Sequence, residues 1–353
     1  MTSPGLSTRV GVTSPALSTR LDIERRFAID AVLAASRLTR AVRADLDPTT
    51  AASKADRSPV TVADLGAQAL VSMALAETMP GDGLLGEEDS RPLAASAELA
   101  RAVLTRVQEQ HPEATPEDVR AALDRCDDPG GPGRRWWTLD PVDGTKGFLR
   151  DEQYAVALAL VEDSQVVLAV MACPNLPLEG EPGAHGGSGP LGCLFVAEHG
   201  EGAVMRPLSG SGMGPGERIR VASPASTAEA RYAESVEAAH SNQSEAARIG
   251  ASLGITTEPL RLDSQTKYAV VARGDASIYL RLPHAGYREN VWDHAAGYLI
   301  VSEAGGRVSD VRGRPLDFTT GRRMTANSGI VATAASIHDE VLTAVRSVVG
   351  QPG

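Results

Sequence analysis

The chain has few cysteines, and their small number excludes some classes of protein. Only three of its 353 residues are cysteines, Cys126, Cys173 and Cys193, and they lie far apart without a Cys-x-x-Cys pair. An odd number of separated cysteines argues against a disulfide framework and against a zinc cluster, and it favours a reducing compartment. We therefore expect a cytoplasmic protein.

Long apolar runs and a basic excess are lacking as well. No apolar run approaches the ~18 residues that a membrane-spanning helix requires, so we expect a soluble protein. Asp and Glu number 45 against 34 Lys and Arg, which gives a net charge of −11. Nucleic acids and acidic membrane surfaces attract proteins with a basic field instead. The sequence therefore predicts no nucleic-acid or membrane partner, and no obligate protein partner is evident.

The N-terminal segment differs from the rest of the chain. Residues 2–9 recur almost unchanged as residues 13–20, without an acidic residue and without the apolar core of a secretory signal. This composition predicts a disordered tail over residues 1–20. Its Ser, Thr and Arg content also suits a segment for import into an organelle, which stays the alternative.

The N-terminal half of the folded part contains several predicted helices. Apolar residues recur at three- and four-residue steps between residues 27 and 38, which predicts an amphipathic helix. A second helix is predicted over residues 63–79, ended by Pro80-Gly81. Residues 93–133 indicate two polar helices in an insertion.

Strands follow, and then an alternation of strands and helices. A strand is predicted over residues 135–139, a hairpin over 154–161 and 166–173, and a further strand over 194–197. Beyond a Gly- and Pro-rich stretch the pattern predicts strands over 219–221 and 276–280, and helices over 245–253, 268–272 and 291–303. Alternation of this kind favours an α/β architecture. We expect an α+β domain over residues 21–217 and an α/β domain over residues 218–350.

The most specific motif is Asp140-Pro141-Val142-Asp143, followed by Gly144-Thr145. A strand would deliver Asp140, Pro141 would force a turn, and Asp143 would return three residues later. Two carboxylates with a carbonyl between them suit Mg²⁺, which prefers oxygen ligands. The N–H groups of Gly144 and Thr145, at the start of a short helical turn, suit a phosphate oxygen. An Asp-Pro turn that only caps a helix is the alternative for this motif alone.

Three further segments contain acids, each with an alternative interpretation. Glu87 and Glu88 follow an apolar pair, although runs of charge usually form solvated loops. Asp293 is predicted in the first turn of an apolar helix, where its negative charge could interact favourably with the helix dipole. Trp292 and the alanines around it indicate burial, and a buried, unpaired acid is costly unless a metal binds it. Asp64 lies at the start of the predicted second helix and could be its N-cap.

Taken together, the four segments resemble the lithium-sensitive, Mg²⁺-dependent phosphatases related to inositol monophosphatase. That family has an Asp at the start of the second helix, Gly-Glu-Glu, Asp-Pro-(Ile/Val)-Asp-Gly-Thr, and Trp-Asp-x-Ala-Ala-Gly before a helix that ends in Gly-Gly. All of these occur here in the family order, between about Leu21 and Val348. The resemblance implies the layered α-β-α-β-α sandwich of the inositol monophosphatase and fructose bisphosphatase type.

Several motifs resemble one branch, the 3′(2′),5′-bisphosphate nucleotidases. They are the segments 144–150, 173–176, 262–268 and 279–283, together with the long insertion between Glu88 and Asp140. The resemblance implies hydrolysis of the 3′-phosphate of adenosine 3′,5′-bisphosphate to AMP and phosphate, and often of the 5′-phosphosulfate analogue. It also implies two or three Mg²⁺ ions and inhibition by Li⁺.

The resemblance also implies roles for individual residues. The metal ligands would be Glu87, Asp140, Asp143, Asp293 and the Val142 carbonyl, with Glu88 beside them or bound through a water. Asp64 and Thr145 would activate the nucleophilic water. The residues expected to hold the nucleotide are His240, Ser264, Lys267 and Arg281, and Asp143, Gly144, Thr145 and Asp293 would also face the substrate.

Two departures from the family pattern affect these assignments. Val142 replaces the commoner Ile, which is harmless if only its carbonyl binds. The segment around His240 has diverged most, and this histidine could equally be an exposed loop residue.

The expected mechanism is in-line hydrolysis, with Mg²⁺ ions ~3.5–4 Å apart between the nucleophile and the phosphate. Thr145 would orient the water and pass its proton toward Asp64. The alternatives are a phosphatase of the same fold for an inositol polyphosphate or another sugar phosphate, and a non-catalytic nucleotide sensor. A dinucleotide-binding dehydrogenase is excluded because no predicted strand is followed by G-x-G-x-x-G.

Overall fold

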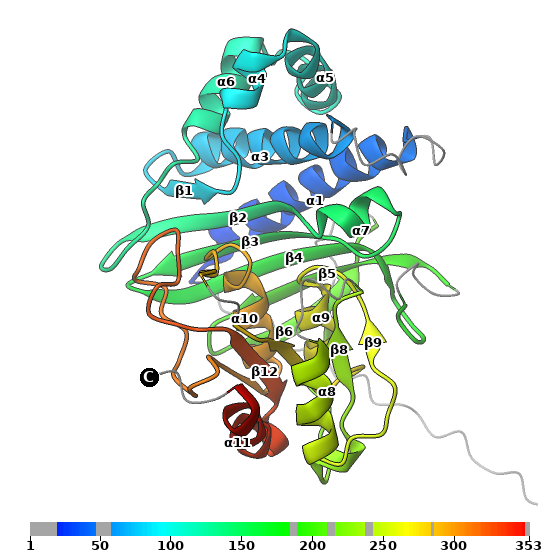
Figure 1. Cartoon of the computed structure of the whole chain (residues 1–353). Coiled ribbons are helices and arrows are strands. Elements are labelled where there is room, and N and C mark those ends of the chain that lie inside the picture. The colour runs from blue at the N-terminus through cyan, green and yellow to red at the C-terminus, as the bar shows by residue number, and fades with distance from the viewer. Residues whose placement is uncertain are drawn as a thin grey trace, which may run out of the picture.

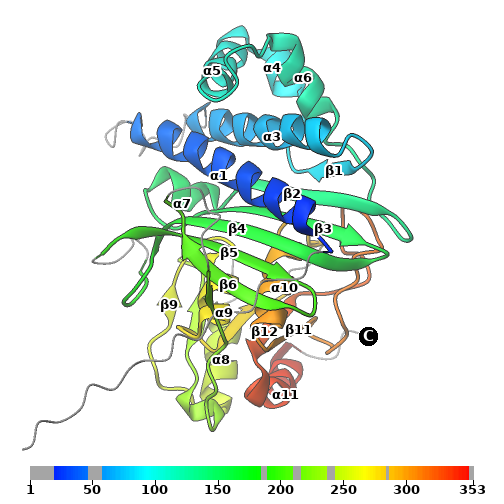
Figure 2. The same cartoon turned by 180° about the vertical axis from the view of Figure 1, so that it is seen from behind.

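The computed structural model describes residues 20–46, 58–183, 189–209, 216–236, 243–283 and 286–349. They form alternating layers of helices and sheets (Figure 1). Two long helices cover one face of a seven-stranded sheet, and two shorter helices separate that sheet from a five-stranded one. Another helix pair covers the outer face of the second sheet, which Figure 2 shows from behind. The predicted α-β-α-β-α sandwich is confirmed.

The helices are spread over all of these layers. The outer pair on the first sheet is α1 (Asp22–Ala44) and α3 (Ser58–Thr78), the central pair is α9 (Thr266–Arg273) and α10 (Ala295–Glu303), and the pair beyond the second sheet is α8 (Gln243–Ser252) and α11 (His338–Val349). The insertion supplies α4 (Arg91–Ala95), α5 (Ala97–Gln108) and α6 (Pro116–Asp124), of which α5 and α6 pack on α3. α7 (Thr145–Leu149) follows the Asp140 motif.

The seven-stranded sheet has its strands in chain order, from β1 to β7. Its strands are β1 (Gly83–Gly86), β2 (Arg135–Asp143), β3 (Ala155–Glu162), β4 (Gln165–Pro177), β5 (Leu191–Glu198), β6 (Gly202–Pro207) and β7 (Glu217–Arg218). β1 runs parallel to β2, and all later pairs are antiparallel. The predicted hairpin is β3–β4, whose connection places Asp163 and Ser164 at positive φ, as tight hairpin turns require.

The five-stranded sheet has the order β11-β12-β10-β8-β9. Its strands are β8 (Tyr232–Glu234), β9 (Leu260–Arg261), β10 (Ile278–Arg281), β11 (Gly306–Ser309) and β12 (Ile330–Ala334). The strand predicted at 219–221 is wrong. β7 ends at Arg218, although the N–H of Ile219 still bonds to the Ala203 carbonyl of β6. The N–H of Val221 bonds instead to the carbonyl of Ala304, at the end of α10. The division into domains at residue 217 stays a prediction.

The two long helices bury their apolar residues in different ways. α1 buries the predicted stripe, with Phe27 edge-on to Trp137 of β2 at 5.0 Å between ring centroids. α3 is apolar on most sides because it lies between the sheet and the helices of the insertion. By length and composition α3 could cross a membrane, but 72% of this stretch is buried inside the fold.

Candidate active site

The parallel pairing of β1 with β2 brings the first two acidic motifs together. Gly86, the last residue of β1, pairs with Leu139 of β2. β1 ends at this level while β2 continues in the same direction, so Glu87 follows β1 beside Asp140 of β2. Carboxyl ends of neighbouring parallel strands are a common place for functional side chains.

β2 does not turn at Pro141 as the sequence predicts. Asp140 pairs with Ala157 and Asp143 with Ala155, so β2 has one more residue than β3 between these two pairs. This is a β-bulge, where a proline without an N–H group is tolerated. The bulge keeps both acids on one strand and replaces the expected turn.

α3 contributes Asp64 and also holds the Glu87–Glu88 segment. Asp64 is buried, and Gln68 follows it by one helical turn on the same face. The Gln68 side chain donates to the Glu88 carbonyl at 2.7 Å and accepts from the Glu88 N–H at 3.0 Å. A Cβ on Gly86 would lie 2.4 Å from Gln68 Oε1, so only glycine allows this close approach.

The carboxylates are crowded enough to disfavour their charged forms. Burial, and then the charges of Glu88 and Glu87, raise the pKa of Asp64 well above its usual value. Burial and the neighbouring acids, with Glu87 first, also raise the pKa of Asp140. Water reaches the Glu87 side chain, but loss of solvation and then the charges of Asp293, Glu88 and Asp143 raise its pKa to about 8. These acids therefore form one electrostatic cluster.

A loop from the second half of the chain closes on Asp143. The N–H of Gln265 donates to Asp143 Oδ2 at 2.6 Å, and the Gln265 side chain donates to the Trp292 carbonyl at 3.0 Å. Ser264 has a positive φ of 68°. A Cβ on Gly144, whose φ is 94°, would lie 2.7 Å from the Ser264 Cβ. The loop thus links the Asp143 segment to the Asp293 segment.

Asp293 lies outside the helix in which the sequence predicts it. α10 begins at Ala295 with His294 as its N-cap, so the predicted helix start at 291 is wrong. Residues 291–294 form a turn in which the N–H of Ala295 bonds to the Val291 carbonyl at 3.0 Å. Asp293 is therefore not held in the first helical turn, and its side chain joins the acid cluster.

Two basic side chains lie on the Asp143 side of the cluster. Burial lowers the pKa of Lys267 to about 8, although the charge of Asp143 opposes this shift. Burial alone would lower the pKa of Arg281, but the charges of Glu289 and then Asp293 raise it well above its usual value. Arg281 Nε lies 2.8 Å from Glu289 Oε2, and its Nη2 lies 3.3 Å from Asp293 Oδ2. The site thus places cations next to a cluster of anions.

The remaining predicted residues have different environments. Thr145 is exposed and is the first residue of α7, whose N-cap is Gly144. Val142 is buried in the bulge. Ser264 is buried, and its Oγ lies 2.8 Å from Thr266 Oγ1. His240 lies outside the described residues, so its role stays a prediction.

Comparison with known proteins identifies the family. The profile of the inositol monophosphatase family matches residues 22–349, which is most of the chain. The chain belongs to the inositol monophosphatase family.

Curated relatives and solved structures agree with this family. A 3′(2′),5′-bisphosphate nucleotidase of Oryza sativa is 44% identical over 335 residues, covering 90% of this chain and 92% of the relative. A protein of the same name from Emericella nidulans is 43% identical, covering 84% of this chain and 90% of the relative. An inositol monophosphatase structure from Zymomonas mobilis matches with a TM-score of 0.60 and 20% identity, covering 93% of this chain and all (100%) of that chain, so it supports the fold alone.

The residues of this inositol monophosphatase family member fit a metal. The family implies a divalent metal, typically Mg²⁺. Asp140 Oδ1 is buried without a hydrogen-bond partner among the described residues. A buried oxygen of this kind is costly unless a cation binds it, and carboxylates are the ligands that Mg²⁺ prefers.

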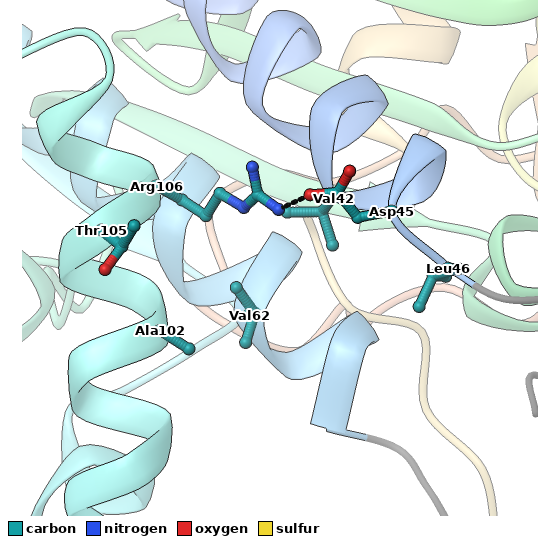
Figure 3. A pocket seen from close by; sticks show the side chains of 7 residues that line it. All are labelled: Val42, Asp45, Leu46, Val62, Ala102, Thr105 and Arg106. Atoms are coloured by element: carbon teal, nitrogen blue, oxygen red, sulfur yellow. Dashed lines mark hydrogen bonds and ion pairs between the residues drawn. The ribbon is translucent and has the colours of Figure 1, made fainter.

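A hollow elsewhere in the molecule is unrelated to this site. It has a volume of about 410 Å³ and lies between the end of α1, the start of α3 and α5 (Figure 3). Its lining is mostly apolar, and its Arg106 and Asp45 form an ion pair. None of its lining residues belongs to the predicted site, and at Leu46 it borders residues that are not described.

Sequence reasoning missed several side chains of the site. They are Gln68, Gln265, Tyr287 and Glu289. A signal existed for Gln68, because an amide in an otherwise apolar, buried helix needs a partner. For the others the contacts arise between distant segments, and no local pattern marks them.

Gln68 is predicted to position the Glu87–Glu88 segment. Substitution Gln68→Met keeps the volume but removes both hydrogen bonds to the Glu88 backbone. Loss of a residue that orients metal ligands typically costs ~10–100-fold in activity or metal affinity. We expect a loss of this size in Mg²⁺-dependent turnover, measured by steady-state phosphate release.

A matched control lies one turn further along α3. Ser72 is buried and its Oγ donates to the Ala122 carbonyl of α6 at 2.7 Å, away from the acids. Ser72→Ala should leave turnover within about twofold of the parent. Equal activities of the two variants would show that Gln68 does not position the acids.

Proposed function

We propose that this chain is a Mg²⁺-dependent phosphatase that removes the 3′-phosphate of adenosine 3′,5′-bisphosphate and yields AMP and phosphate. The observation that supports this most strongly is the buried acid cluster with Lys267 and Arg281 beside Asp143. The names of relatives that are 40–44% identical over most of the chain agree with this substrate.

Two opposite kinds of charge suit a substrate with two phosphates. The acids would hold Mg²⁺ for the reacting phosphate, and Lys267 and Arg281 would bind the 5′-phosphate. Arg is well suited to a phosphate because its planar fork can donate two parallel hydrogen bonds. A monophosphate would leave the buried Lys267 and the partly exposed Arg281 without an anion from the substrate.

The residues that would hold Mg²⁺ are Glu87, Asp140, Asp143, Asp293 and the Val142 carbonyl, with Glu88 beside them. Bound Mg²⁺ supplies Lewis acidity to the phosphoryl oxygens and lowers the pKa of water. We propose two or three ions per site. The bulge of β2 places Asp140 and Asp143 on one strand, and the parallel pairing of β1 with β2 places Glu87 beside them.

Asp64 and Thr145 are the groups that we assign to proton transfer. A general base works best when its pKa lies near the working pH, and burial raises the pKa of Asp64 in that direction. Thr145 accepts the proton from water and passes its own toward Asp64. The N–H groups of Gly144 and Thr145, at the start of α7, would donate to a phosphate oxygen.

The adenosine part of the substrate is assigned to Ser264 and His240. Ser264 is held by its positive φ next to Gly144. We propose hydrolysis of the 3′-phosphate of 3′-phosphoadenosine 5′-phosphosulfate as well, because a phosphosulfate also presents anionic oxygens to Lys267 and Arg281. Cytoplasmic location is likewise proposed, with import through residues 1–20 as the alternative.

Phosphate release from adenosine 3′,5′-bisphosphate tests the function directly. We expect turnover with Mg²⁺, none with a chelator, and inhibition by millimolar Li⁺. Inositol 1,4-bisphosphate and fructose 1,6-bisphosphate at equal concentration should be hydrolysed at least tenfold more slowly. A preference for either sugar phosphate would replace this proposal by the second candidate of the same fold.

Asp64→Asn tests the base. The substitution keeps the size of the side chain and removes its ability to accept a proton, and general-base assistance is typically worth ~10²–10⁴ in rate. We therefore expect kcat to fall by at least about 10²-fold while the far-ultraviolet circular dichroism stays unchanged. If turnover of the variant stays within a few-fold of the parent, Asp64 is not the general base.

A further inference from the structure

Arg281 is connected to a buried row of polar side chains that extends away from the acid cluster. Its Nε lies 2.8 Å from Glu289 Oε2. The same oxygen lies 3.0 Å from His294 Nε2, and His294 Nδ1 lies 2.8 Å from the Tyr268 hydroxyl. Glu289, His294 and Tyr268 are all buried, at 4%, 0% and 0% exposure. Buried polar groups that are fully partnered hold one another in a single arrangement.

The hydrogens in this row have one consistent order. A carboxylate can only accept, so in a neutral imidazole Nε2 is the donor and Nδ1 accepts from the Tyr268 hydroxyl. Nε2 then carries the imidazole hydrogen and donates to Glu289. Glu289 in turn accepts from Arg281. Each contact therefore fixes the next one, and the last group that is fixed is the guanidinium.

Arg281 forms ion pairs with two carboxylates, Glu289 outside the acid cluster and Asp293 within it. Its Nη2 is 3.3 Å from Asp293 Oδ2, which is a longer contact than the one with Glu289. Asp293 belongs to the acid cluster, and a metal bound there would compete with Arg281 for its oxygens. Glu289 gives the arginine a second and closer carboxylate, so Asp293 does not balance its charge alone.

The same geometry argues against a separate metal at this place. Ligand atoms of Glu289, Asp293 and His294 lie within 4.8 Å of one another, as in a metal site. However, Arg281 and His294 both already contact Glu289 Oε2. The guanidinium is the cation of this group, and the backbone of Glu289 is held by the N–H of Met324 at 2.9 Å.

We propose that Glu289 is a positioning residue for the phosphate of the substrate that does not react, because it aligns Arg281 toward that phosphate through the closer of the two ion pairs of the guanidinium. This inference rests on the proposed function. His294 and Tyr268 act through Glu289 by fixing the orientation of its carboxylate. The Arg281 side chain is 28% exposed, so part of the guanidinium stays open to a ligand.

The test compares two substrates that differ only in the 5′-phosphate. Adenosine 3′,5′-bisphosphate and adenosine 3′-phosphate share the reacting group, so the ratio of their kcat/KM values reports the grip on the 5′-phosphate. We expect the full-length protein with Mg²⁺ to prefer the bisphosphate, and Glu289→Gln to lower this preference at least tenfold. A residue that only stabilised the fold would lower both kcat/KM values together.

Glu303→Gln is the matched control. Glu303 is the last residue of α10, at the opposite end of the helix from Asp293. Its carboxylate accepts from the N–H groups of Gly200 and Gly202, both at 2.9 Å. It should keep the parental preference. A folded Glu289→Gln variant that also keeps that preference overturns the inference and leaves the proposed function intact. A parent that does not hydrolyse the bisphosphate at all overturns both.

A double variant covers the case in which Glu289→Gln does not fold. Arg281→Gln and the charge-balanced pair Arg281→Gln with Glu289→Gln should show the same substrate preference, because Glu289 acts only through Arg281. A difference of more than threefold between them would mean that Glu289 acts on the substrate by another route, and would overturn the inference.

Discussion

The repulsion among the buried carboxylates is the interaction on which the rest of this site depends. Asp64 comes from α3, Glu87 follows β1, and Asp140 and Asp143 lie on β2. Loss of solvation together with the charge of neighbouring acids raises the pKa of each. A fold that gathers like charges in a place of low solvation carries a free-energy cost. Divalent cations offset that cost, so the same feature that strains the metal-free protein gives the site its affinity for Mg²⁺.

The scaffold holds these acids on rigid elements, and each element has a local reason for its shape. Parallel pairing of β1 with β2 puts two acids side by side, and a bulge at Pro141 keeps Asp143 on the same strand. The positive φ of Ser264 brings a loop from the second half of the chain onto Asp143. Such strain in a non-glycine residue costs about 1–3 kcal/mol and is typical of functional sites. Arg281 completes the arrangement, because its shorter ion pair is with Glu289, outside the acid cluster, and its longer one is with Asp293.

Local patterns allowed most helices and strands and the acidic motifs to be predicted, and the resemblance of those motifs to a family implied the layers. The apolar stripe of α1 and the turn at Asp163 follow from periodicity and turn chemistry. The bulge at Pro141 could not be predicted, since it arises from the register with β3, and an Asp-Pro pair suggests a turn when read alone. The sequence predicts the start of α10 at residue 291, but the helix begins at Ala295. The apolar run around Asp293 contains no residue that marks this boundary. Contacts of Gln68 and Glu289 with distant residues need the tertiary structure.

Unfolding of the parent and of Asp140→Asn, each with a chelator and with Mg²⁺ at pH 8, tests the central claim most directly. With the chelator the variant should be the more stable protein, because it removes one charge from the cluster. Mg²⁺ at about 100 times its dissociation constant should add about 2.7 kcal/mol to the free energy of unfolding of the parent and much less to that of the variant. A variant that is less stable than the parent in chelator, together with a parent whose stability does not respond to Mg²⁺, would contradict the account.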